Sequence, residues 1–480
     1  MEKTIFSHSC PGRTGAALPA LDVPETPVPE EYLRKAPIGL PQVTENQVLR
    51  HFVRMSVNNF NIEKGMYPLG SCTMKYNPRL NEYLARTENL AAVHPLSPDS
   101  TVQGSLELLH RVGEFFCEIT GFEAITLQPS AGAQGEFAGL LLIKKWQEDR
   151  GEGHRNEVLM PDSAHGTNPA TSTLAGLKVV SVKSNDQGRV DVEDLRKKAG
   201  NNTCALMLTN PNTLGIFESG IAEITRIVHD AGGLNYMDGA NMNAMMGIAR
   251  PGDMGFDVCH LNVHKTFSTP HGGGGPGAGP VCCRDFLAPF LPASVVEKTP
   301  DGYRLHDKTG KSLGRLLAFH GNTGVFYRAY AYIRTLGAEG IREVSEVALI
   351  NANYLKARLA PYYEVPFDDG PCMHEFVASG EAMARKGVKT LDIAKRLLDY
   401  GFHAPTVYFP LIVKEALMIE PTETESLETI DEFADAMIAI AREASEKPHL
   451  VTDAPVNTPV LRLDEVKAVK DLILVEPFDD

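Results

Sequence analysis

The chain has 480 residues, of which 43% are hydrophobic and 22% are charged, so its composition is that of a globular protein with a sizeable core. The length suggests about three units of roughly 150 residues each, although one large α/β domain can take up more. A net charge of −15 disfavours non-specific binding to nucleic acid or to an anionic membrane surface, so neither partner is expected.

The cysteines and the apolar runs indicate a cellular compartment. Eight cysteines give no disulfide-scaffold density, and no Cys-x-x-Cys pair has zinc spacing, so no metal site is expected. Cys72 is kept open for another role because it lies inside a dense motif. The sequence contains no secretory signal and no apolar run of about 18 residues, so we expect a cytoplasmic protein without a transmembrane helix.

The first 60 residues are rich in proline, which resists regular secondary structure. We expect residues 1–60 to form an extended N-terminal arm that could embrace a partner subunit in an oligomer. The remainder divides, in this prediction, into a large α/β domain over residues 61–335 and a small C-terminal α+β domain over residues 336–480.

From about residue 100, short apolar runs alternate with segments of helical periodicity, which predicts a largely parallel sheet covered on both faces. The expected strands are 123–128, 157–160, 178–182, 204–209, 234–237, 258–263 and 279–282. The expected helices are 102–120, 135–146, one starting at Asn168-Pro169 with Asn168 as its cap, and 221–231. Ligands bind at the carboxyl ends of such strands, which here are Gln128, Met160, Thr209, Met237 and Val263.

The C-terminal part begins with a long helical stretch over 325–360. Behind it we expect a strand at 375–377 and helices at 391–400 and 430–445, which fit the small α+β domain.

Lys265 follows an expected strand and precedes the glycine-rich segment 272–277. This order suits an enzyme that uses pyridoxal 5′-phosphate (PLP), because the cofactor aldehyde forms a Schiff base with a lysine held at a strand end. Burial of that lysine would favour the neutral amine that imine exchange requires. His264 could reach the phosphate or assist proton transfer. A His-Lys pair taken alone is more often surface charge.

Asp238 ends the apolar strand at 234–237, where a buried carboxylate needs a partner. A pyridinium N–H is such a partner, and Ala240 leaves room for a flat ring. His165 follows another strand and could stack on the ring. Each residue has an ordinary alternative, a capping or salt-bridged aspartate and a hydrogen-bonded loop histidine.

The small-residue turn Ser130-Ala131-Gly132-Ala133-Gln134-Gly135 lies between a strand and a helix. Its backbone can approach a phosphate at a helix N-terminus, although an ordinary strand-to-helix turn has the same composition. It lacks the lysine and hydroxyl residue of a P-loop. The turn, His165, Asp238 and Lys265 together favour one PLP site.

Three long motifs resemble the glycine decarboxylase (glycine cleavage system P-protein) family over roughly residues 30–470. They are Asn262-Val263-His264-Lys265-Thr266-Phe267 with the glycine-rich segment after it, Gly65-Met66-Tyr67-Pro68-Leu69-Gly70-Ser71-Cys72-Thr73-Met74-Lys75-Tyr76-Asn77-Pro78, and Gln128-Pro129-Ser130-Ala131-Gly132-Ala133-Gln134-Gly135-Glu136. The length and the lysine resemble subunit 2 of the two-subunit form of this family.

The resemblance implies a fold-type-I PLP enzyme. Lys265 would carry the cofactor, Asp238 would pair with the pyridine nitrogen, and His165 would stack on the ring. Ala131, Gly132 and His264, with Ser130 beside them, would hold the phosphate, and Ala240 would lie against the ring. Asn212 resembles an asparagine that contacts the ring hydroxyl in related enzymes.

The implied reaction is the decarboxylation of glycine, with release of carbon dioxide and transfer of the aminomethyl group to the lipoyl arm of the H-protein. The implied assembly is a heterotetramer with subunit 1, two copies of each. Two alternatives stay open at this point. One is another fold-type-I enzyme, such as an aminotransferase or a cysteine desulfurase-like protein, and the other is a non-catalytic interaction subunit.

Overall fold

The computed structural model describes residues 3–94, 97–271, 277–307, 310–317, 321–367 and 370–474. These residues belong to two compact units, one made of Met1–Gly65 with Ala454–Asp480 and the other of Met66–Asp453. Most of the glycine-rich segment after Lys265, residues 272–276, lies outside the described residues. Among the helices that are described, none is both long and apolar enough to cross a membrane.

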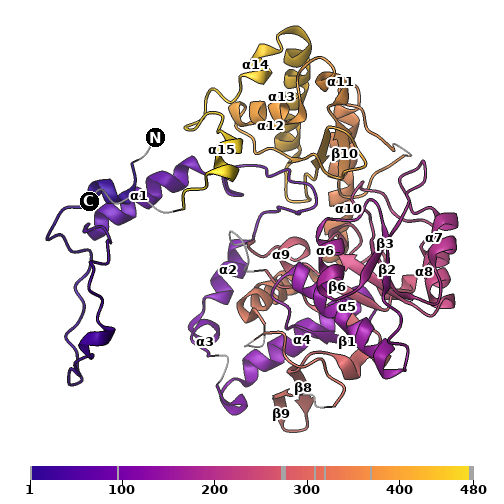
Figure 1. Cartoon of the computed structure of the whole chain (residues 1–480), viewed down its shortest axis with the longest axis horizontal. Coiled ribbons are helices and arrows are strands. Elements are labelled where there is room, and N and C mark those ends of the chain that lie inside the picture. The colour runs from indigo at the N-terminus through magenta and orange to yellow at the C-terminus, as the bar shows by residue number, and fades with distance from the viewer. Residues whose placement is uncertain are drawn as a thin grey trace. The chain divides into compact units, whose positions relative to one another are not determined.

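The first unit combines the two ends of the chain (Figure 1). Its main helix is α1 (Glu45–Asn58), which begins at a capping box made by Thr44 and Gln47. The short helices η1 (Ile5–His8), η2 (Glu30–Tyr32) and α15 (Glu465–Lys470) complete it. Long stretches between them have no regular structure, as the prolines predict for the N-terminal part.

A seven-stranded sheet forms the centre of the second unit, in the order β1-β7-β6-β5-β4-β2-β3. Strands β2 to β6 are parallel to their neighbours in this group, whereas β7 is antiparallel to both β6 and β1. The prediction of a largely parallel α/β sheet is therefore confirmed. The strands are β1 (Ala124–Thr126), β2 (Glu157–Pro161), β3 (Lys178–Val182), β4 (Thr203–Thr209), β5 (Leu234–Gly239), β6 (Val258–Leu261) and β7 (Val281–Cys283).

Alternate residues of the central strands enter two different hydrophobic cores. Leu206 and Leu208 of β4 belong to one core, whereas Ala205 and Met207 belong to the other. A strand that is buried on both faces reads as one continuous apolar run, which is why the sequence shows no alternation here. The covering helices include α4 (Gln103–Thr120), α5 (Gly132–Asp149), α6 (Thr167–Leu174), α7 (Val192–Lys198) and α8 (Ile221–Asp230).

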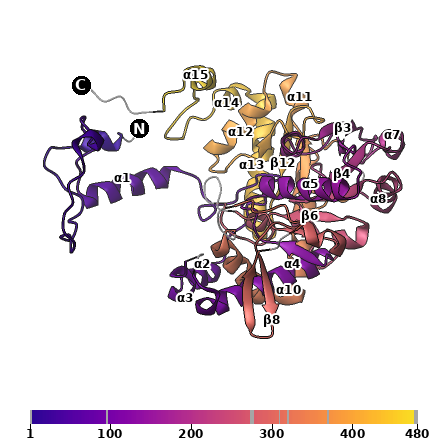
Figure 2. The same ribbon diagram turned by 60° about the horizontal axis from the view of Figure 1, so that its bottom comes forward.

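The start of α6 differs from the prediction. The helix begins at Thr167 with Gly166 as its N-cap, so Asn168 lies inside the first turn and does not cap it. The Asn168 side chain instead donates a hydrogen bond to the Asp238 carboxylate, which outweighs a local capping contact. The hairpin of β8 (Val295–Thr299) and β9 (Gly302–His306) was not predicted, and Figure 2 shows it projecting from the body of the unit.

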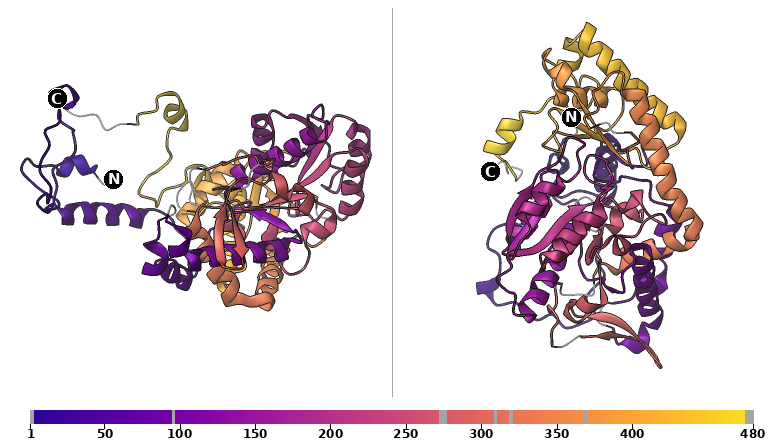
Figure 3. Two further views of the ribbon diagram at one scale, coloured as in Figure 1. Left: turned by 90° about the horizontal axis from the view of Figure 1, so that it is seen from below. Right: turned by 90° about the vertical axis from the view of Figure 1, so that its right-hand side faces the viewer.

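Helix α10 (Thr323–Leu359) runs from the large sheet to a three-stranded sheet (Figure 3, right). It is interrupted at Gly337, whose φ of 66° and ψ of −174° are not helical. The small antiparallel sheet has the order β10-β12-β11, with β10 (Phe376–Ser379), β11 (Thr406–Val407) and β12 (Ala416–Ile419). Helices α12 (Thr390–Asp399) and α13 (Leu427–Glu446) pack on it around a third hydrophobic core. They correspond to the helices expected at 391–400 and 430–445.

Candidate active site

Seven of the nine predicted site residues line one cavity beyond the carboxyl ends of β4, β5 and β6. The cavity has an empty volume of about 710 Å³, including its open mouth. Parallel strands end at a common sheet edge, so side chains that follow different strands meet there. The cavity is lined by Ser71, Ala131, Gly132, Ala133, Glu136, His165, Thr167, Thr209, Thr213, Asp238, Ala240, Asn241, Asn262, His264 and Lys265.

Lys265 lies on α9 (Val263–Thr266), a single helical turn that follows β6 directly. This turn replaces the strand end that was predicted to carry the lysine. The Lys265 Nζ donates a hydrogen bond of 2.8 Å to the backbone oxygen of Ser71, which comes from a segment 194 positions earlier in the chain. The amine is therefore held at the cavity wall by a contact that sequence spacing does not reveal.

Asp238 lies in β5 and is almost fully buried. Its carboxylate accepts hydrogen bonds of 2.9 Å from the Asn168 amide and 2.9 Å from the backbone N–H of Ala240. Burial acts to raise the pKa of Asp238, but the neighbouring His260 and these hydrogen bonds outweigh it and hold the pKa below its usual range. The site therefore presents an ionised carboxylate to the cavity.

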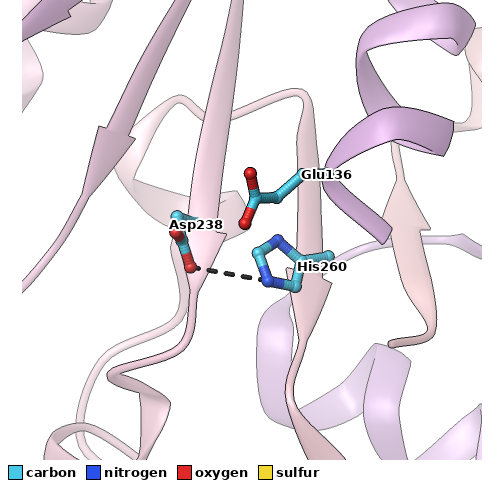
Figure 4. A group of neighbouring side chains, drawn as sticks. All are labelled: Glu136, Asp238 and His260. Carbon is cyan, nitrogen blue, oxygen red and sulfur yellow. Dashed lines mark ion pairs between the residues drawn. The ribbon is translucent and has the colours of Figure 1, made fainter. Parts of the chain in front are cut away.

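Glu136 and His260 surround Asp238 (Figure 4). The Nε2 of His260 lies 3.5 Å from Asp238 Oδ1, and its Nδ1 shares a 2.7 Å hydrogen bond with the hydroxyl of Tyr236. Burial raises the pKa of Glu136, and the charge of Asp238 adds to the effect. We call Glu136, Asp238 and His260 the β5 cluster.

His165 follows β2 and lines the same cavity. Its Nδ1 lies 2.9 Å from the hydroxyl of Thr167, which in turn donates to Glu136 over 2.8 Å. Burial and the nearby Lys265 ammonium lower the pKa of His165, so its imidazole is neutral at neutral pH. A neutral, fixed aromatic ring is suited to lie against a flat heteroaromatic ligand.

The small-residue turn brings the N-terminus of α5 to the cavity. A Cβ on Gly132 would lie 2.6 Å from Asn262 Oδ1, so only glycine lets the backbone come this close. His264 lies next to the turn, and burial with the neighbouring His271 and Lys265 lowers its pKa to about 3. Its Nδ1 is buried without a hydrogen-bond partner among the described residues, which leaves it available to a ligand.

The structure does not bring Ser130 and Asn212 to the cavity. The hydroxyl and the N–H of Ser130 both donate to Gln134 within the turn. The Asn212 amide donates to Gly188 O over 2.9 Å, and its oxygen accepts from two backbone N–H groups of the loop that follows it. Their predicted cofactor contacts remain predictions.

A second buried group of acids and imidazole, His374, Glu375 and Glu420, lies beside the segment that holds Lys265. All three side chains are fully buried. The backbone N–H of Ser71 donates to Glu375 over 2.7 Å, and that of Thr73 donates to Glu420 over 3.0 Å. We call these three residues the small-sheet cluster.

The sequence analysis did not identify Asn168, His260 or the small-sheet cluster as part of the site. Glu136 is the last residue of a motif that resembles the family, and the motif alone gives it no role. His260 is one polar residue in an apolar strand, and the cluster lies at least 109 positions from Lys265 in the chain. A buried polar residue inside an otherwise apolar run was the available signal, because such a residue requires a partner.

The fold is that of the fold-type-I PLP-dependent enzymes. The solved structure of a glycine decarboxylase (P-protein) of the glycine cleavage system, in inhibitor-bound form, superposes with a TM-score of 0.72 at 22% identity. It covers 85% of this chain and 92% of that one. At this identity the likeness establishes the fold alone.

Sequence comparison identifies the family. The model of the glycine cleavage system P-protein matches residues 20–310, and that of the glycine dehydrogenase C-terminal domain matches residues 344–459. The chain therefore belongs to the glycine cleavage system P-protein family. Two similar relatives are probable glycine dehydrogenase (decarboxylating) subunit 2 proteins. That of Chlorobium chlorochromatii is 58% identical over 98% of this chain and 99% of its own length, and that of Halalkalibacterium halodurans is 55% identical over 98% and 97%.

Proposed function

We infer that this chain is a PLP-dependent glycine decarboxylase, acting as subunit 2 of glycine dehydrogenase (decarboxylating). The observation that carries this conclusion is the placement of Lys265 and Asp238 on the walls of one cavity in a chain of this family. A lysine that can bond an aldehyde and an ionised carboxylate that can face a ring nitrogen are the two groups that PLP chemistry requires.

The residues of the cavity fit PLP. The N-terminus of the 18-residue helix α5 offers backbone N–H groups at Ala131 and Gly132 to a phosphate. The Nδ1 of His264, which has no hydrogen-bond partner among the described residues, would supply a further polar contact on that side. Asp238 and His165 would then hold the ring nitrogen and one ring face, and Ala240 would leave room beside the ring. Lys265 would hold the cofactor covalently.

When bound, PLP supplies an electron-withdrawing ring that accepts the electron pair left behind as glycine loses its carboxyl group as carbon dioxide. Asp238 keeps the ring nitrogen protonated, because its own pKa is held low by His260 and Asn168. With PLP bound, Lys265 would yield its place to the amine of glycine, and its own amine on the cavity wall could then accept or donate a proton.

The acceptor and the assembly are part of the same proposal. The aminomethyl carbon forms a bond to one sulfur of the lipoyl disulfide of the H-protein, while the S–S bond breaks and the second sulfur takes up a proton. The disulfide is reduced and the carbon is oxidised, which makes the enzyme an oxidoreductase. We propose a cytoplasmic heterotetramer with subunit 1. The division into an arm, a large and a small domain at about residues 60 and 335 belongs to this proposal.

The alternatives are less well supported. Curated relatives above 50% identity carry the decarboxylating name over nearly the whole chain, which favours glycine decarboxylation over aminotransfer or desulfuration. A non-catalytic subunit would be expected to lack the lysine or the aspartate, and both line the cavity.

The test is the glycine-dependent exchange of labelled bicarbonate into the carboxyl group of glycine. It is measured with the chain and subunit 1 together, with and without lipoylated H-protein. We expect exchange that requires PLP and glycine and rises strongly with the H-protein. A complex that contains PLP but exchanges no label under any of these conditions would contradict the proposed reaction.

A further inference from the structure

The turn over residues 70–73 forms part of the cavity wall and contacts Lys265 directly. Lys265 Nζ donates its hydrogen bond of 2.8 Å to the backbone oxygen of Ser71, and both residues line the cavity. Ser71 and Thr73 have positive φ angles of 67° and 45°, which are costly for residues other than glycine. Such strain persists only where the surrounding structure enforces it, so the position of the Ser71 oxygen is imposed by other parts of the chain.

Backbone contacts tie this turn to the small antiparallel sheet. Leu69 forms an isolated antiparallel bridge with Ile419 of β12, and the N–H of Gly70 donates to the oxygen of Met418 over 3.2 Å. A side chain at position 70 would collide with Met418, so glycine is required for this close approach. The hydroxyl of Thr406 in β11 donates to the oxygen of Gly70 over 2.7 Å. The small sheet therefore sets where the turn lies.

Two carboxyl groups of the small-sheet cluster fix the turn at its strained residues. Glu375 Oε2 accepts from the N–H of Ser71 over 2.7 Å, and Glu420 Oε2 accepts from the N–H of Thr73 over 3.0 Å. Both acidic side chains are fully buried, so without them these N–H groups would be buried and unpaired. Glu375 thus holds the N–H of the residue whose oxygen holds Lys265.

We propose that the backbone oxygen of Ser71 is the resting acceptor for Lys265 whenever this lysine is not bonded to the cofactor. Glu375 and Glu420 are the positioning residues that keep this acceptor in place. The inference rests on the proposed function, because PLP takes up the lysine and glycine displaces it.

The exchange of the lysine for glycine releases an ammonium group that requires an acceptor. The bond between Lys265 Nζ and the cofactor carbon breaks while a bond between the glycine nitrogen and the same carbon forms. Nζ carries one hydrogen while it is bonded to the cofactor and three when it is free, and the two that it gains come from the ammonium of the incoming glycine. The freed ammonium is a donor only, and Ser71 O accepts one of its hydrogen bonds. A lysine held in this way must break that contact before it can return to the cofactor.

Loss of this acceptor should change the affinities for PLP and for glycine in opposite directions. The contact stabilises the two states in which Lys265 is free, which are the cofactor-free protein and the protein in which glycine has replaced the lysine. Weakening the contact raises the free energy of both states relative to the one in which the lysine is bonded to PLP. PLP should then bind more tightly and glycine less tightly, whereas simple damage to the cavity would weaken the binding of both.

The test measures both affinities in the full-length chain assembled with subunit 1, without the H-protein. PLP is titrated into the cofactor-free complex and glycine into the PLP-loaded complex, and the visible absorbance of the cofactor reports each. Glu375→Leu removes the acceptor of the Ser71 N–H, so we expect glycine to bind about tenfold more weakly and PLP about tenfold more tightly. Glu375→Gln keeps an acceptor oxygen and imitates the neutral acid, because burial and Glu420 raise the pKa of Glu375, and it should recover most of both changes. The exposed Glu446→Leu is the matched control and should bind both as the wild type does.

A second variant loosens the same turn from the small sheet and decides the question if Glu375→Leu fails to fold. Thr406→Val removes the hydroxyl that holds the oxygen of Gly70 and keeps a β-branched side chain in β11. We expect the same opposite changes, about threefold each. Any other pattern in a folded variant, such as weaker binding of both ligands or unchanged binding of glycine, would overturn the inference and leave the proposed function intact. A wild-type complex that binds no PLP would overturn both.

Discussion

The β5 cluster and the small-sheet cluster contain the same chemical groups, two carboxylates and one imidazole, yet their charges differ. In the β5 cluster, the pKa of Asp238 is lowered although burial opposes this, whereas in the small-sheet cluster burial raises the pKa of both Glu375 and Glu420. Both clusters are buried and both feel the charge of Lys265. Composition and depth therefore do not decide which acid ionises.

The difference lies in what donates to each acid. Asp238 accepts from a side-chain amide and a backbone N–H, and its imidazole neighbour is fixed by the hydroxyl of Tyr236. Glu420 accepts from the backbone N–H of Thr73, but its second oxygen has no hydrogen-bond partner among the described residues. At Asp238 the nearby imidazole and two hydrogen bonds outweigh burial, whereas at Glu420 the donors and the charge of Lys265 do not.

Replacing Lys265, whose charge acts on the acids of both clusters, should have the largest effect. Lys265→Ala removes the amine, so borohydride treatment of the PLP-loaded protein should trap no adduct, and exchange activity should be lost. The adduct is measured by mass spectrometry and by the visible absorbance of the bound cofactor. Lys447→Ala, at the exposed end of α13, is the matched control and should behave as the wild type. A trapped adduct at the wild-type level in Lys265→Ala would refute the assignment of the lysine.

Asp238→Asn tests the charge of the β5 cluster with little change in shape. The exchange rate should fall by about 10³-fold, which corresponds to about 4 kcal/mol, because a neutral amide does not keep the ring nitrogen protonated. Glu136→Gln is the matched control in the same cluster. Its pKa is already raised by burial, so the neutral side chain should cost less than about tenfold. An Asp238→Asn enzyme that keeps more than a tenth of the wild-type rate would exclude this role.

Lys75→Met tests whether Lys75 is committed to Glu423 and is therefore not a counter-ion for the small-sheet cluster. Lys75 and Glu423 form a buried pair, so removing the lysine leaves an unpaired buried carboxylate. The free energy of unfolding should fall by at least about 3 kcal/mol, measured by denaturant titration. Restoring charge balance in Lys75→Met with Glu423→Leu should recover part of the loss. A loss below about 1 kcal/mol in the single variant would show that Glu423 finds another partner.

The sequence was sufficient for the fold where burial dictates it. Strands β4 and β5 were predicted to within two residues because they are buried along their whole length and read as apolar runs. Strand β3 was predicted with its observed bounds although it is a partly exposed edge strand, because three of its five residues are valine. The β8–β9 hairpin was missed because its residues are only partly buried and show no such run. The break of α10 at Gly337 was missed because one glycine within a helical pattern does not by itself end a helix.

Only the residues of the cavity that come from the large sheet could be predicted from the sequence. Lys265, Asp238, His165 and the Gly132 turn each lie at or just after the end of a strand of one sheet, so topology alone brings them together. Ser71 and the small-sheet cluster reach the site from other parts of the second unit, where no periodicity links them to it. Asn212 shows the limit of reasoning from position. Its amide donates to Gly188 and its oxygen accepts from the loop that follows it, so its predicted contact with the cofactor remains a prediction.

The small-sheet cluster should also leave a signature in stability against pH. The pKa of His374 is about 3 in the folded chain and about 6.5 when unfolded, so the unfolded state binds more protons between these values. Stability that is present above pH 6.5 is therefore lost as the pH falls. Between pH 6.5 and about pH 5 this residue should cost about 2 kcal/mol, and His374→Gln should remove that part of the loss. Unfolding titrations at the two pH values measure it, and an identical loss in both proteins would show that His374 is protonated in the folded state.

His260→Gln should have the smallest effect, because it weakens the β5 cluster without removing its acid. Without the imidazole near Asp238, the pKa of that carboxyl group should rise, since burial is then opposed only by the hydrogen bonds and Lys265. We expect about a tenfold loss of exchange rate, which corresponds to about 1.4 kcal/mol, and a shift of the acidic limb of the pH profile to higher pH. Tyr236→Phe removes only the hydroxyl that orients His260 and should shift the same limb by less. A lower rate with an unmoved acidic limb would mean that His260 acts through packing, and the charge of Asp238 would then depend on Asn168 and the backbone alone.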